Sequence, residues 1–281
     1  MDIVRRVHAM KDLVRRARAE GRRVGFVPTM GFLHEGHAAL IRRIRQESDL
    51  TVVSVFVNPA QFGPGEDFGR YPRDLARDSD LCIAEGVDLL FTPEADEIYP
   101  AGASTFVEVA GLSSRLEGAS RPGHFRGVTT VVLKLFQIVM PHVAAFGQKD
   151  AQQAIVVQRM VRDLLLDVEI LVLPTVRDHD GVALSSRNVY LSPDERRSAR
   201  AVPEALQAAE EAIAAGEREP ARIVDAARER LEAGNLLRVD YVELVDTNLL
   251  QPVARAEGEM LLAIAVFAGK TRLIDNTIIR P

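Results

Sequence analysis

A pair of histidines follows the first strand-like segment of the chain. The apolar run Arg23–Pro28 predicts a strand, and the pattern of Glu35–Glu47 predicts the helix after it. His34 and His37 are three residues apart, so both lie on one face near the N-terminus of that helix. Free backbone N–H groups and the helix dipole favour an anion at such a position. The two imidazoles can therefore donate hydrogen bonds to the oxygens of a phosphate group.

The spacing of these histidines is compatible with three interpretations. Nucleotide binding and ordinary hydrogen bonding within the turn fit the pattern equally well. Zinc binding is the third, but a zinc site needs a further ligand, and no cluster of Cys, His or Asp lies nearby in the sequence. The lone Cys82 falls inside the predicted helix Tyr71–Gly86, away from every motif, so we expect it to pack as a small apolar residue.

Uncharged amides follow the second strand-like run, Leu50–Val57. Asn58 and Gln61 come just past its end, and α/β proteins bind their ligands at the C-terminal ends of parallel strands. Amide groups at this edge can bind hydroxyl and carboxylate oxygens. The alternative is a plain Asn-Pro turn beside a glutamine whose hydrogen bonds are satisfied.

Two later segments combine charge with other polar groups. Lys149 and Asp150 open the predicted helix Asp150–Leu165, where a lysine can contact phosphate and an aspartate can cap the helix or bind a ribose hydroxyl. Gln153 follows Asp150 at i+3 and is expected to point towards the same region. The segment Ser185–Arg187 joins two hydroxyls to a permanent cation, which suits a polyphosphate, although in isolation it is an ordinary polar loop.

Strand-like and helical segments alternate through the first two thirds of the chain. This alternation predicts a parallel sheet with helices on both faces. The predicted strands are Arg23–Pro28, Leu50–Val57, Asp88–Phe91, Ser104–Ala110, His142–Phe146 and Asp167–Leu173, and the predicted helices are Glu35–Glu47, Tyr71–Gly86, Gly127–Met140 and Asp150–Leu165.

The pattern changes near Pro174. Residues Pro193–Gly234 are rich in Ala, Glu and Arg and predict two helices broken around Gly216–Pro220. Three strand-like runs with hairpin-length connections follow. We therefore predict a Rossmann-like, doubly wound parallel sheet in residues 1–175, and a smaller α+β domain with a short antiparallel sheet in residues 176–281. The three runs are Arg238–Val245, Met260–Ala268 and Arg272–Ile279.

Composition and charge exclude several classes of protein. The chain has 281 residues, of which 47% are hydrophobic and 27% are charged, and its formal net charge is -5, so nothing in its charge favours a nucleic acid partner. No apolar run approaches the length of a membrane span, and the basic N-terminal segment lacks the apolar core of a signal peptide. One cysteine cannot form an intramolecular disulfide. We expect a cytoplasmic protein with no nucleic acid and no membrane partner.

Five segments, taken in order, resemble the motifs of one enzyme family. The string PTMGFLHEGH contains the His-x-Gly-His turn of a nucleotidyltransferase superfamily shared with class I aminoacyl-tRNA synthetases, and as a whole it resembles the pantothenate synthetase family. That family commonly has alanine where this chain has Phe32. The resemblance spans residues 28 to 188, and the C-terminal third fits by predicted architecture only. The other four segments are Val57–Phe62 (VNPAQF), His124–Val128 (HFRGV), Phe146–Gln153 (FGQKDAQQ) and Leu184–Asn188 (LSSRN), which resemble the family's VNPxQF, HFxGV, FGxKDxQQ and SSRN.

The resemblance implies an ATP-dependent ligase. Such an enzyme condenses pantoate with β-alanine to give pantothenate, AMP and pyrophosphate through a pantoyl adenylate. It would work as a homodimer, with Mg²⁺ carried by the ATP phosphates, no metal ligand from the protein, and a second domain that closes to exclude water. The implied catalytic residues, which offset charge on the phosphates, are His34, His37, Lys149, Ser185, Ser186 and Arg187.

The resemblance also implies where each substrate binds. Pantoate would lie between Gln61 and Gln153 near Met30, and β-alanine would contact Asn58 and Gln61. The implied ATP-binding residues are Met30, His34, His37, Gly147, Lys149, Asp150, Val176, Leu184, Ser185, Ser186 and Arg187.

Three other functions remain as alternatives. A nucleotidyltransferase acting on a phosphorylated small molecule would need a cationic pocket, whereas Asn58, Gln61 and Gln153 are neutral amides. A tRNA-charging enzyme would need net positive charge and an anticodon-binding domain. A regulatory nucleotide-binding module is disfavoured because Lys149 and Arg187 accompany both histidines.

Overall fold

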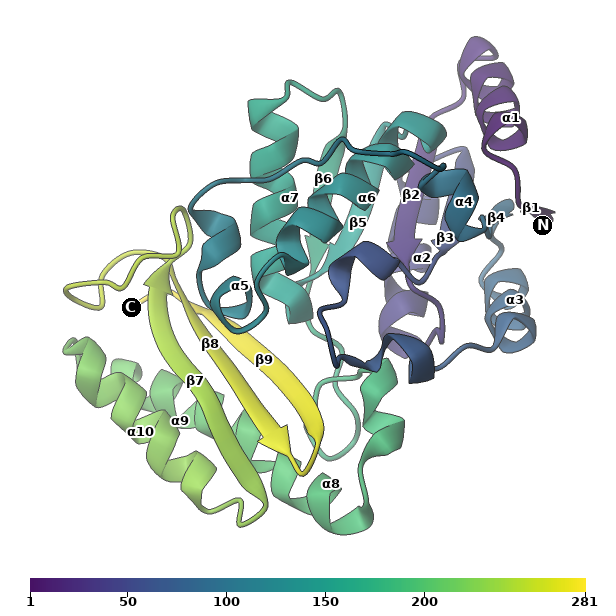
Figure 1. Cartoon of the computed structure of the whole chain (residues 1–281). Coiled ribbons are helices and arrows are strands. Elements are labelled where there is room, and N and C mark those ends of the chain that lie inside the picture. The colour runs from purple at the N-terminus through teal and green to yellow at the C-terminus, as the bar shows by residue number, and fades with distance from the viewer. The chain divides into compact units, whose positions relative to one another are not determined.

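The structure, a computed structural model, describes residues 1–281 and divides into two compact units (Figure 1). The first unit is Met1–Gln148 together with Gln152–Pro174. The second is Thr175–Pro281 together with Lys149–Ala151. Each unit has its own sheet and its own helices.

The first unit contains a six-stranded parallel sheet in the order β1-β4-β3-β2-β5-β6. From β2 the chain adds β3 and β4 on one side and then returns to add β5 and β6 on the other. The strand order therefore reverses between β2 and β5, and in open parallel sheets such a reversal is where ligands bind. The predicted doubly wound sheet is confirmed. Its strands are β1 (Asp2–Val4), β2 (Val24–Thr29), β3 (Leu50–Val55), β4 (Leu89–Phe91), β5 (Val143–Gly147) and β6 (Glu169–Leu173).

Both faces of the sheet are covered at the central strand β2, where two successive residues that point to opposite faces are both buried. Val27 of β2 shares a buried apolar cluster with Ile41 of α2. Phe26, one residue earlier, has its ring centroid 6.4 Å from that of Phe136 on α6. The helices are α1 (Val7–Ala19), α2 (Glu35–Gln46), α3 (Leu75–Ala84), α4 (Ala95–Ile98), α5 (Glu117–Ser120), α6 (His124–Val139) and α7 (Ala151–Asp163), with the 3-10 turns η1 (Pro59–Gln61), η2 (Asp67–Arg70), η3 (Leu112–Ser114) and η4 (Gln148–Asp150).

The second unit contains a three-stranded antiparallel sheet in the order β7-β8-β9. Helices α9 and α10 lie side by side along this sheet (Figure 1). Leu206 of α9, Ile223 of α10 and Ile264 of β8 belong to one buried apolar cluster. The predicted α+β pattern is confirmed. The elements are η5 (Ser186–Tyr190), α8 (Pro193–Ala199), α9 (Ala201–Ala214), α10 (Pro220–Glu232), β7 (Leu237–Asp246), β8 (Met260–Ala268) and β9 (Thr271–Ile279).

The strand predicted for Ser104–Ala110 is wrong, because this segment is irregular. Its backbone forms hydrogen bonds with side chains of α6, and it does not pair with a neighbouring strand. The Val107 N–H donates to Thr130 Oγ1 at 2.9 Å, and the Thr129 hydroxyl donates to the Val107 carbonyl at 2.6 Å. Alternating apolar residues cannot distinguish these two ways of satisfying the backbone.

The segment predicted as two helices holds three. The extra break falls at Arg200, between α8 and α9. Pro203 explains it, because proline has no N–H to donate to the carbonyl of Ala199 four residues earlier. The N-terminal segment, whose pattern is helical, also begins with the short strand β1, in which Asp2 pairs with Leu89 of β4.

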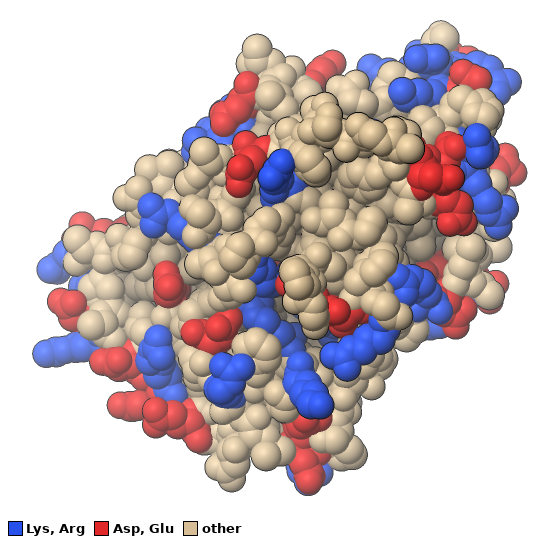
Figure 2. Space-filling view, viewed as in Figure 1, with Lys and Arg blue, Asp and Glu red and all other residues tan.

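The surface carries both signs of charge. Figure 2 shows acidic and basic side chains interspersed over the face in view, in agreement with the small net charge of -5. None of the helices combines the length and apolar character that a membrane crossing requires.

Candidate active site

His34 and His37 form a reciprocal cap at the start of α2, directly after β2. His34 Nδ1 accepts a hydrogen bond from the Gly36 N–H at 3.2 Å, and His37 Nδ1 accepts one from the His34 N–H at 3.3 Å. A Cβ on Gly36 would lie 3.0 Å from the His34 ring, which explains the glycine in this turn. Because each Nδ1 accepts, each neutral ring carries its hydrogen on Nε2. Nε2–H is then the hydrogen-bond donor of each ring.

Asp78 of α3 fixes the backbone of the same turn. Its two carboxylate oxygens accept hydrogen bonds from the Phe32 N–H at 2.8 Å and the Leu33 N–H at 2.7 Å. Gly31 and Phe32 both have positive φ, 84° and 50°, a conformation that is strained for a side chain such as that of phenylalanine. Burial raises the pKa of Asp78, and the two backbone hydrogen bonds oppose that rise. The strained turn therefore depends on a buried carboxylate from a neighbouring helix.

Asn58 is fully hydrogen-bonded within the first unit. Its Nδ2 donates to Gln61 Oε1 at 3.0 Å and to the Gly127 carbonyl at 3.1 Å. Its Oδ1 accepts from the Ala60 N–H at 3.2 Å and from the Tyr99 hydroxyl at 2.8 Å. These bonds use both donors and both acceptor positions of the amide. The predicted contact of Asn58 with β-alanine stays a prediction, and it would require one of these bonds to be exchanged.

Gln61 has a defined amide orientation as a result. Because Oε1 accepts from Asn58, Nε2 faces the sulfur of Met30, 3.1 Å away. Thioether sulfur is a weak acceptor, and the second N–H of Gln61 bonds to no protein group. Met30 follows β2 and Gln61 follows β3, so this contact brings two of the sequence-predicted segments together. The Gln61 amide is an available donor in a largely buried position.

The backbone of helix α6 packs directly against the backbone of η1. A Cβ on Gly127 would lie 2.2 Å from the Ala60 carbonyl oxygen, so only glycine permits this packing. The helix begins at His124, three residues before the predicted start at Gly127, and Gly127 therefore lies inside its first turns. The glycine of the HFRGV segment is needed for this contact, which the motif alone does not reveal.

The carbonyl of Gln61 is held by charged and aromatic neighbours. His124 Nδ1 lies 2.9 Å from it, and Arg121 donates to His124 Nε2 at 3.2 Å. Since arginine can only donate, His124 is neutral, with its hydrogen on Nδ1. Burial lowers the pKa of His124 to about 4, and the charge of Arg121 acts in the same direction.

Glu66 completes this support. Both of its carboxylate oxygens accept hydrogen bonds from Arg121, at 2.6 and 2.9 Å. Burial raises the pKa of Glu66, but the bonds and charge of Arg121 outweigh it, so that the pKa lies below its usual value. The arginine nearest to Gln61 is thus already neutralised by a bidentate partner.

Gly147 ends β5, the strand next to β2 at the reversal of strand order. Nothing lies within 4 Å of the position that a Cβ on Gly147 would occupy. Protein packing therefore does not require glycine here. Open space beside the end of β5 is consistent with the predicted contact between this residue and a nucleotide.

The two adjacent glutamines of α7 differ in use. Gln152 is buried, and its Nε2 donates to the carbonyls of Leu112 at 2.9 Å and Arg115 at 2.8 Å, while its Oε1 accepts from the Glu117 N–H at 3.0 Å. Gln153 is half-buried and makes no hydrogen bond to protein groups. The first glutamine connects α7 to the segment of η3 and the start of α5, whereas the amide of the second is not used in this way.

In the second unit, the segment from Thr175 to Tyr190 folds back on itself. Arg177 and Ala183 form an isolated antiparallel bridge, and the Leu184 N–H donates to the Val176 carbonyl at 3.0 Å. Val176 and Leu184, both predicted to bind ATP, are therefore neighbours across this turned segment.

Ser185 begins η5 as its N-cap. Its hydroxyl oxygen accepts from the Arg187 N–H at 3.3 Å. Asn188 stabilises the same turn, because its Nδ2 donates to the Ala183 carbonyl at 3.0 Å and its N–H donates to the Ser185 carbonyl at 3.0 Å. Ser185, Ser186 and Arg187 are consecutive in a single tight turn.

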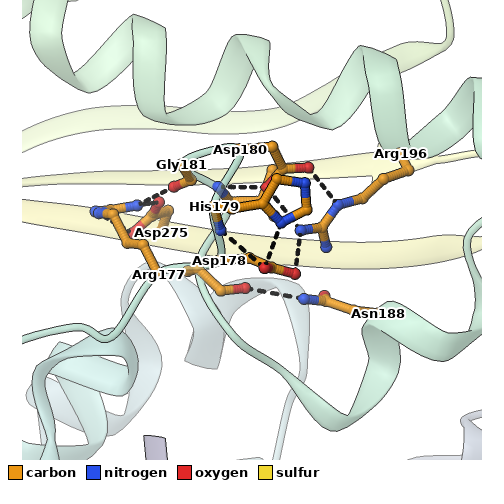
Figure 3. A network of polar contacts seen from close by, with 10 residues as sticks. Arg177, Asp178, His179, Asp180, Gly181, Asn188, Arg196 and Asp275 are labelled. Atoms are coloured by element: carbon orange, nitrogen blue, oxygen red, sulfur yellow. Dashed lines mark hydrogen bonds and ion pairs between the residues drawn. The ribbon is translucent and has the colours of Figure 1, made fainter. Parts of the chain in front are cut away.

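The tip of the folded-back segment is held by α8. Arg196 donates to Asp178 at 2.9 Å and to both carboxylate oxygens of Asp180 at 2.7 Å (Figure 3). The Gly181 N–H donates to the Asp178 carbonyl at 2.9 Å, which closes a tight turn. Hydrogen bonds from His179 lower the pKa of Asp178.

Lys149 and Arg177 are linked to neighbouring residues of β9. Asn276 Nδ2 donates to the Lys149 carbonyl at 2.9 Å. Asp275 accepts two hydrogen bonds from the Arg177 guanidinium, at 2.5 and 3.1 Å. The Lys149 amine itself lies 3.7 Å from Asp150 Oδ1.

The structure contains no group of three or more His, Cys, Asp or Glu side chains that could hold a metal ion.

The comparisons with known proteins agree over the whole chain. Residues 2–278 match the family model described as pantoate-beta-alanine ligase. The chain belongs to this family, and it is an enzyme, a pantoate–β-alanine ligase. Over 279 residues it is 53% identical to the pantothenate synthetase of Moorella thermoacetica and 55% identical to that of Heliobacterium modesticaldum, and each match covers 99% of both chains.

Solved structures of the family have the same fold. The pantothenate synthetase of Thermus thermophilus superposes with a TM-score of 0.95 at 48% identity, over 100% of both chains. The pantoate–β-alanine ligase of Francisella tularensis, crystallised in complex with beta-gamma ATP and β-alanine, superposes with a TM-score of 0.81 at 33% identity, covering 99% of this chain and 97% of that one.

Phe32 is where this ligase departs from the alanine expected at that position. The Arg77 guanidinium lies over its ring, 4.7 Å from the centroid. The aromatic ring therefore gains a cation–π contact on the α3 side, while its backbone N–H is held by Asp78.

Several residues that shape the ligase site escaped the sequence analysis. Asp78 has no motif around it, and Tyr99 and Glu66 lie in segments without periodic pattern. Arg121 stands three residues before His124, so a search around the HFRGV segment for charged neighbours could have found it. Asp78, Tyr99 and Glu66 act through tertiary contacts, which leave no pattern in the neighbouring sequence.

Proposed function

We propose that this ligase activates the carboxylate of pantoate with ATP and then transfers the acyl group to β-alanine. The reciprocal cap of His34 and His37, at the point where the strand order reverses, is the observation that carries this proposal. Its Nε2–H groups suit phosphate oxygens, and Met30, which precedes it in the same loop, contacts Gln61 of the neutral pocket. The Francisella ligase crystallised with an ATP compound and β-alanine supports the same two substrates.

The reaction has two steps. A carboxylate oxygen of pantoate attacks the α-phosphorus of ATP, the bond to pyrophosphate breaks, and pantoyl adenylate forms. The amine of β-alanine then attacks the acyl carbon, loses a proton, and displaces AMP to give pantothenate. No covalent bond to the enzyme is required.

Cys82 supports this route over an acyl-thioester. The thiol is fully buried, and burial raises its pKa to about 12. The thiolate is the nucleophilic form of cysteine, so a buried thiol with this pKa is inert near neutral pH. The proposal therefore places activation on the carboxylate of the substrate.

The phosphate contacts are proposed for the histidine cap, for Lys149, and for the Ser185–Arg187 turn. Their N–H, hydroxyl and cationic groups stabilise the negative charge that grows on the phosphates during attack. Gly147 leaves room for the nucleotide, and Asp150 is proposed to bind a ribose hydroxyl. Backbone groups of Val176 and Leu184 are proposed to line the ATP site.

Mg²⁺ is proposed to enter with ATP. Asp150 is the single carboxylate among the residues proposed to bind the nucleotide. The other groups are mostly hydrogen-bond donors and cations, which bind phosphate oxygens better than they bind a divalent cation. Mg²⁺ commonly keeps several waters and few protein ligands in nucleotide sites. When bound, the ion neutralises charge on the phosphates.

The acyl pocket is proposed to use the amides of Gln61 and Gln153. Asn58 fixes the orientation of Gln61, so that its N–H groups can donate to a carboxylate or hydroxyl oxygen of pantoate. A phosphorylated substrate is disfavoured, because the nearby Arg121 already forms a bidentate pair with Glu66.

A homodimer is proposed as the assembly. The sheet of the first unit ends at β6, whose outer edge has no paired strand. Val172 on that strand is 39% exposed, and Leu165 just before it is 90% exposed, as expected for a surface that another copy covers. Sedimentation that shows only monomer at micromolar concentration would contradict this assembly.

Isotope exchange tests the adenylate. With pantoate and MgATP alone, labelled pyrophosphate should enter ATP without β-alanine, and full turnover should transfer oxygen-18 from the pantoate carboxylate to AMP. A reaction without pantoate is the control. ADP as the product, or exchange that strictly requires β-alanine, would defeat this mechanism.

A further inference from the structure

Strand β9 carries two adjacent polar residues, Asp275 and Asn276, that are both almost completely buried. Neighbouring residues of a strand point to opposite faces of the sheet. β9 is also an edge strand, so one side of it is free of strand pairing. The pair is therefore placed where irregular segments of the chain can bind to the sheet from both faces.

Asp275 holds the segment that leads to Ser185 and Arg187. Its carboxylate pairs in a bidentate way with Arg177, and the same guanidinium donates to the Gly181 carbonyl at 3.1 Å. Arg177 thus connects both arms of the folded-back segment to β9 (Figure 3). The Asp275 side chain is 2% exposed and that of Arg177 is 32% exposed, so water weakens this pair less than an open surface pair.

Asn276 holds Lys149. Its amide donates to the Lys149 carbonyl, and its own N–H donates to Asp275 Oδ1 at 2.8 Å. The Asp275 carboxylate is therefore bonded to the backbone of Asn276 as well as to Arg177. A displacement of either residue would therefore also displace the segments that contain Lys149 and Arg177.

We propose that Asp275 and Asn276 are positioning residues that set the lysine and the Ser185–Arg187 turn in register for phosphate binding. This inference rests on the function proposed above. In this proposal neither residue touches substrate. Asn276 acts on Lys149 through its backbone, and Asp275 acts on Ser185 and Arg187 through Arg177.

A double-mutant cycle tests the first connection. Asn276→Ala should lower the rate of pyrophosphate exchange about tenfold, as expected for a misplaced catalytic group, with the KM for pantoate unchanged. In a Lys149→Ala background the same substitution should change the rate by less than about twofold, because there is no amine left to position. A similar tenfold loss in both backgrounds would overturn the connection.

The second connection has a parallel test. Asp275→Asn weakens the pair with Arg177 and should lower exchange about tenfold, but much less in an Arg187→Ala background. If Asp275→Asn does not fold, as judged by circular dichroism and thermal unfolding, Arg177→Lys tests the same pair, because lysine cannot reproduce the bidentate geometry. Effects of either variant that multiply fully with Arg187→Ala would overturn the inference.

Glu204→Gln is the matched control. Glu204 pairs with Arg230 at 2.8 Å between α9 and α10, and its substitution removes a carboxylate from the same unit without touching β9. It should leave exchange unchanged. Wild-type protein without pantoate-dependent exchange would refute the proposed function itself, whereas normal wild-type exchange with a fully active Asn276→Ala variant would refute only the positioning role.

Discussion

The two units hold their proposed substrate-binding groups by different kinds of interaction. In the first unit, Gln61 is oriented by the neutral amide of Asn58, which makes four hydrogen bonds and is 1% exposed. In the second unit, the folded-back segment is held by ion pairs, in which Arg177 binds Asp275 and Arg196 binds Asp178 and Asp180.

This difference has physical consequences. A buried neutral network fixes one orientation, and leaving any member unpaired carries the full cost of desolvation. Partly exposed ion pairs contribute less to stability than a buried hydrogen-bond network, and salt screens them. We therefore expect substitutions in the first unit to affect both binding and folding, and those in the second to affect mainly the rate or a salt-dependent part of stability.

Lys149→Ala should produce the largest effect. Loss of one preorganised charge at the phosphates is expected to reduce turnover by about a hundred- to a thousandfold, or ~2.7–4 kcal/mol. The thermal unfolding midpoint should move by less than about 2 °C, because the amine contributes little to the core. Lys270→Ala removes an exposed lysine of the same unit and serves as the control. Near-wild-type turnover in folded Lys149→Ala would remove the lysine from the proposed phosphate site.

Gln61→Ala tests the neutral pocket of the first unit. Loss of hydrogen bonds in a largely buried position should cost about 1–3 kcal/mol, seen as a raised KM for pantoate with little change for ATP. Gln153→Ala should act in the same way. Asn58→Ala should also raise the KM for pantoate, and in addition it should lower the unfolding midpoint, because four partners lose their bonds. Equal weakening of ATP and pantoate would mean that the acyl pocket lies elsewhere.

His124 should make the first unit sensitive to acid. Its pKa in the folded protein is about 4, below the ordinary 6.5, so between these values the unfolded state binds more protons. The free energy of unfolding should therefore fall as the pH drops through this window, by about 2 kcal/mol at pH 5 from this residue. Chemical denaturation of wild type and His124→Gln at pH 5 and pH 8 measures the contribution. An equal pH dependence in the two proteins would contradict it.

Asp180→Asn should have the smallest effect. Arg196 binds two carboxylates at the tip of the folded-back segment, and this substitution replaces one of them by a neutral amide. The expected loss of stability is below about 1 kcal/mol in low salt and should shrink at high ionic strength. Denaturation at two salt concentrations measures it. A larger loss that salt does not change would show that this ion pair behaves like the buried network of the first unit.

Much of the first unit could be predicted, because its signals are local. The alternation of apolar strands with amphipathic helices predicts the doubly wound sheet, and the helical pattern after the histidine turn predicts the start of α2 at Glu35. The segment Ser104–Ala110 marks the limit, because hydroxyls of α6 bind its backbone where a strand was expected.

The roles within each motif could be predicted less well. Gln152 and Gln153 are chemically identical neighbours in the sequence. Only the fold shows that the amide of the first bonds to the segment of η3 and the start of α5. The same holds for Asn58, whose partners include Gly127 and Tyr99 from distant parts of the chain.

The sequence by itself determined which chemical groups are present and at which strand ends and helix starts they stand, because strand and helix periodicity and the glycines of tight turns are local properties. The tertiary structure decided which of those groups are used to hold the protein together and which remain for a ligand. A buried polar group must find a partner, and that partner comes from whichever segment the fold brings beside it. Asp78 under the histidine turn and Asn276 behind Lys149 are two such partners, and no local pattern marks either of them.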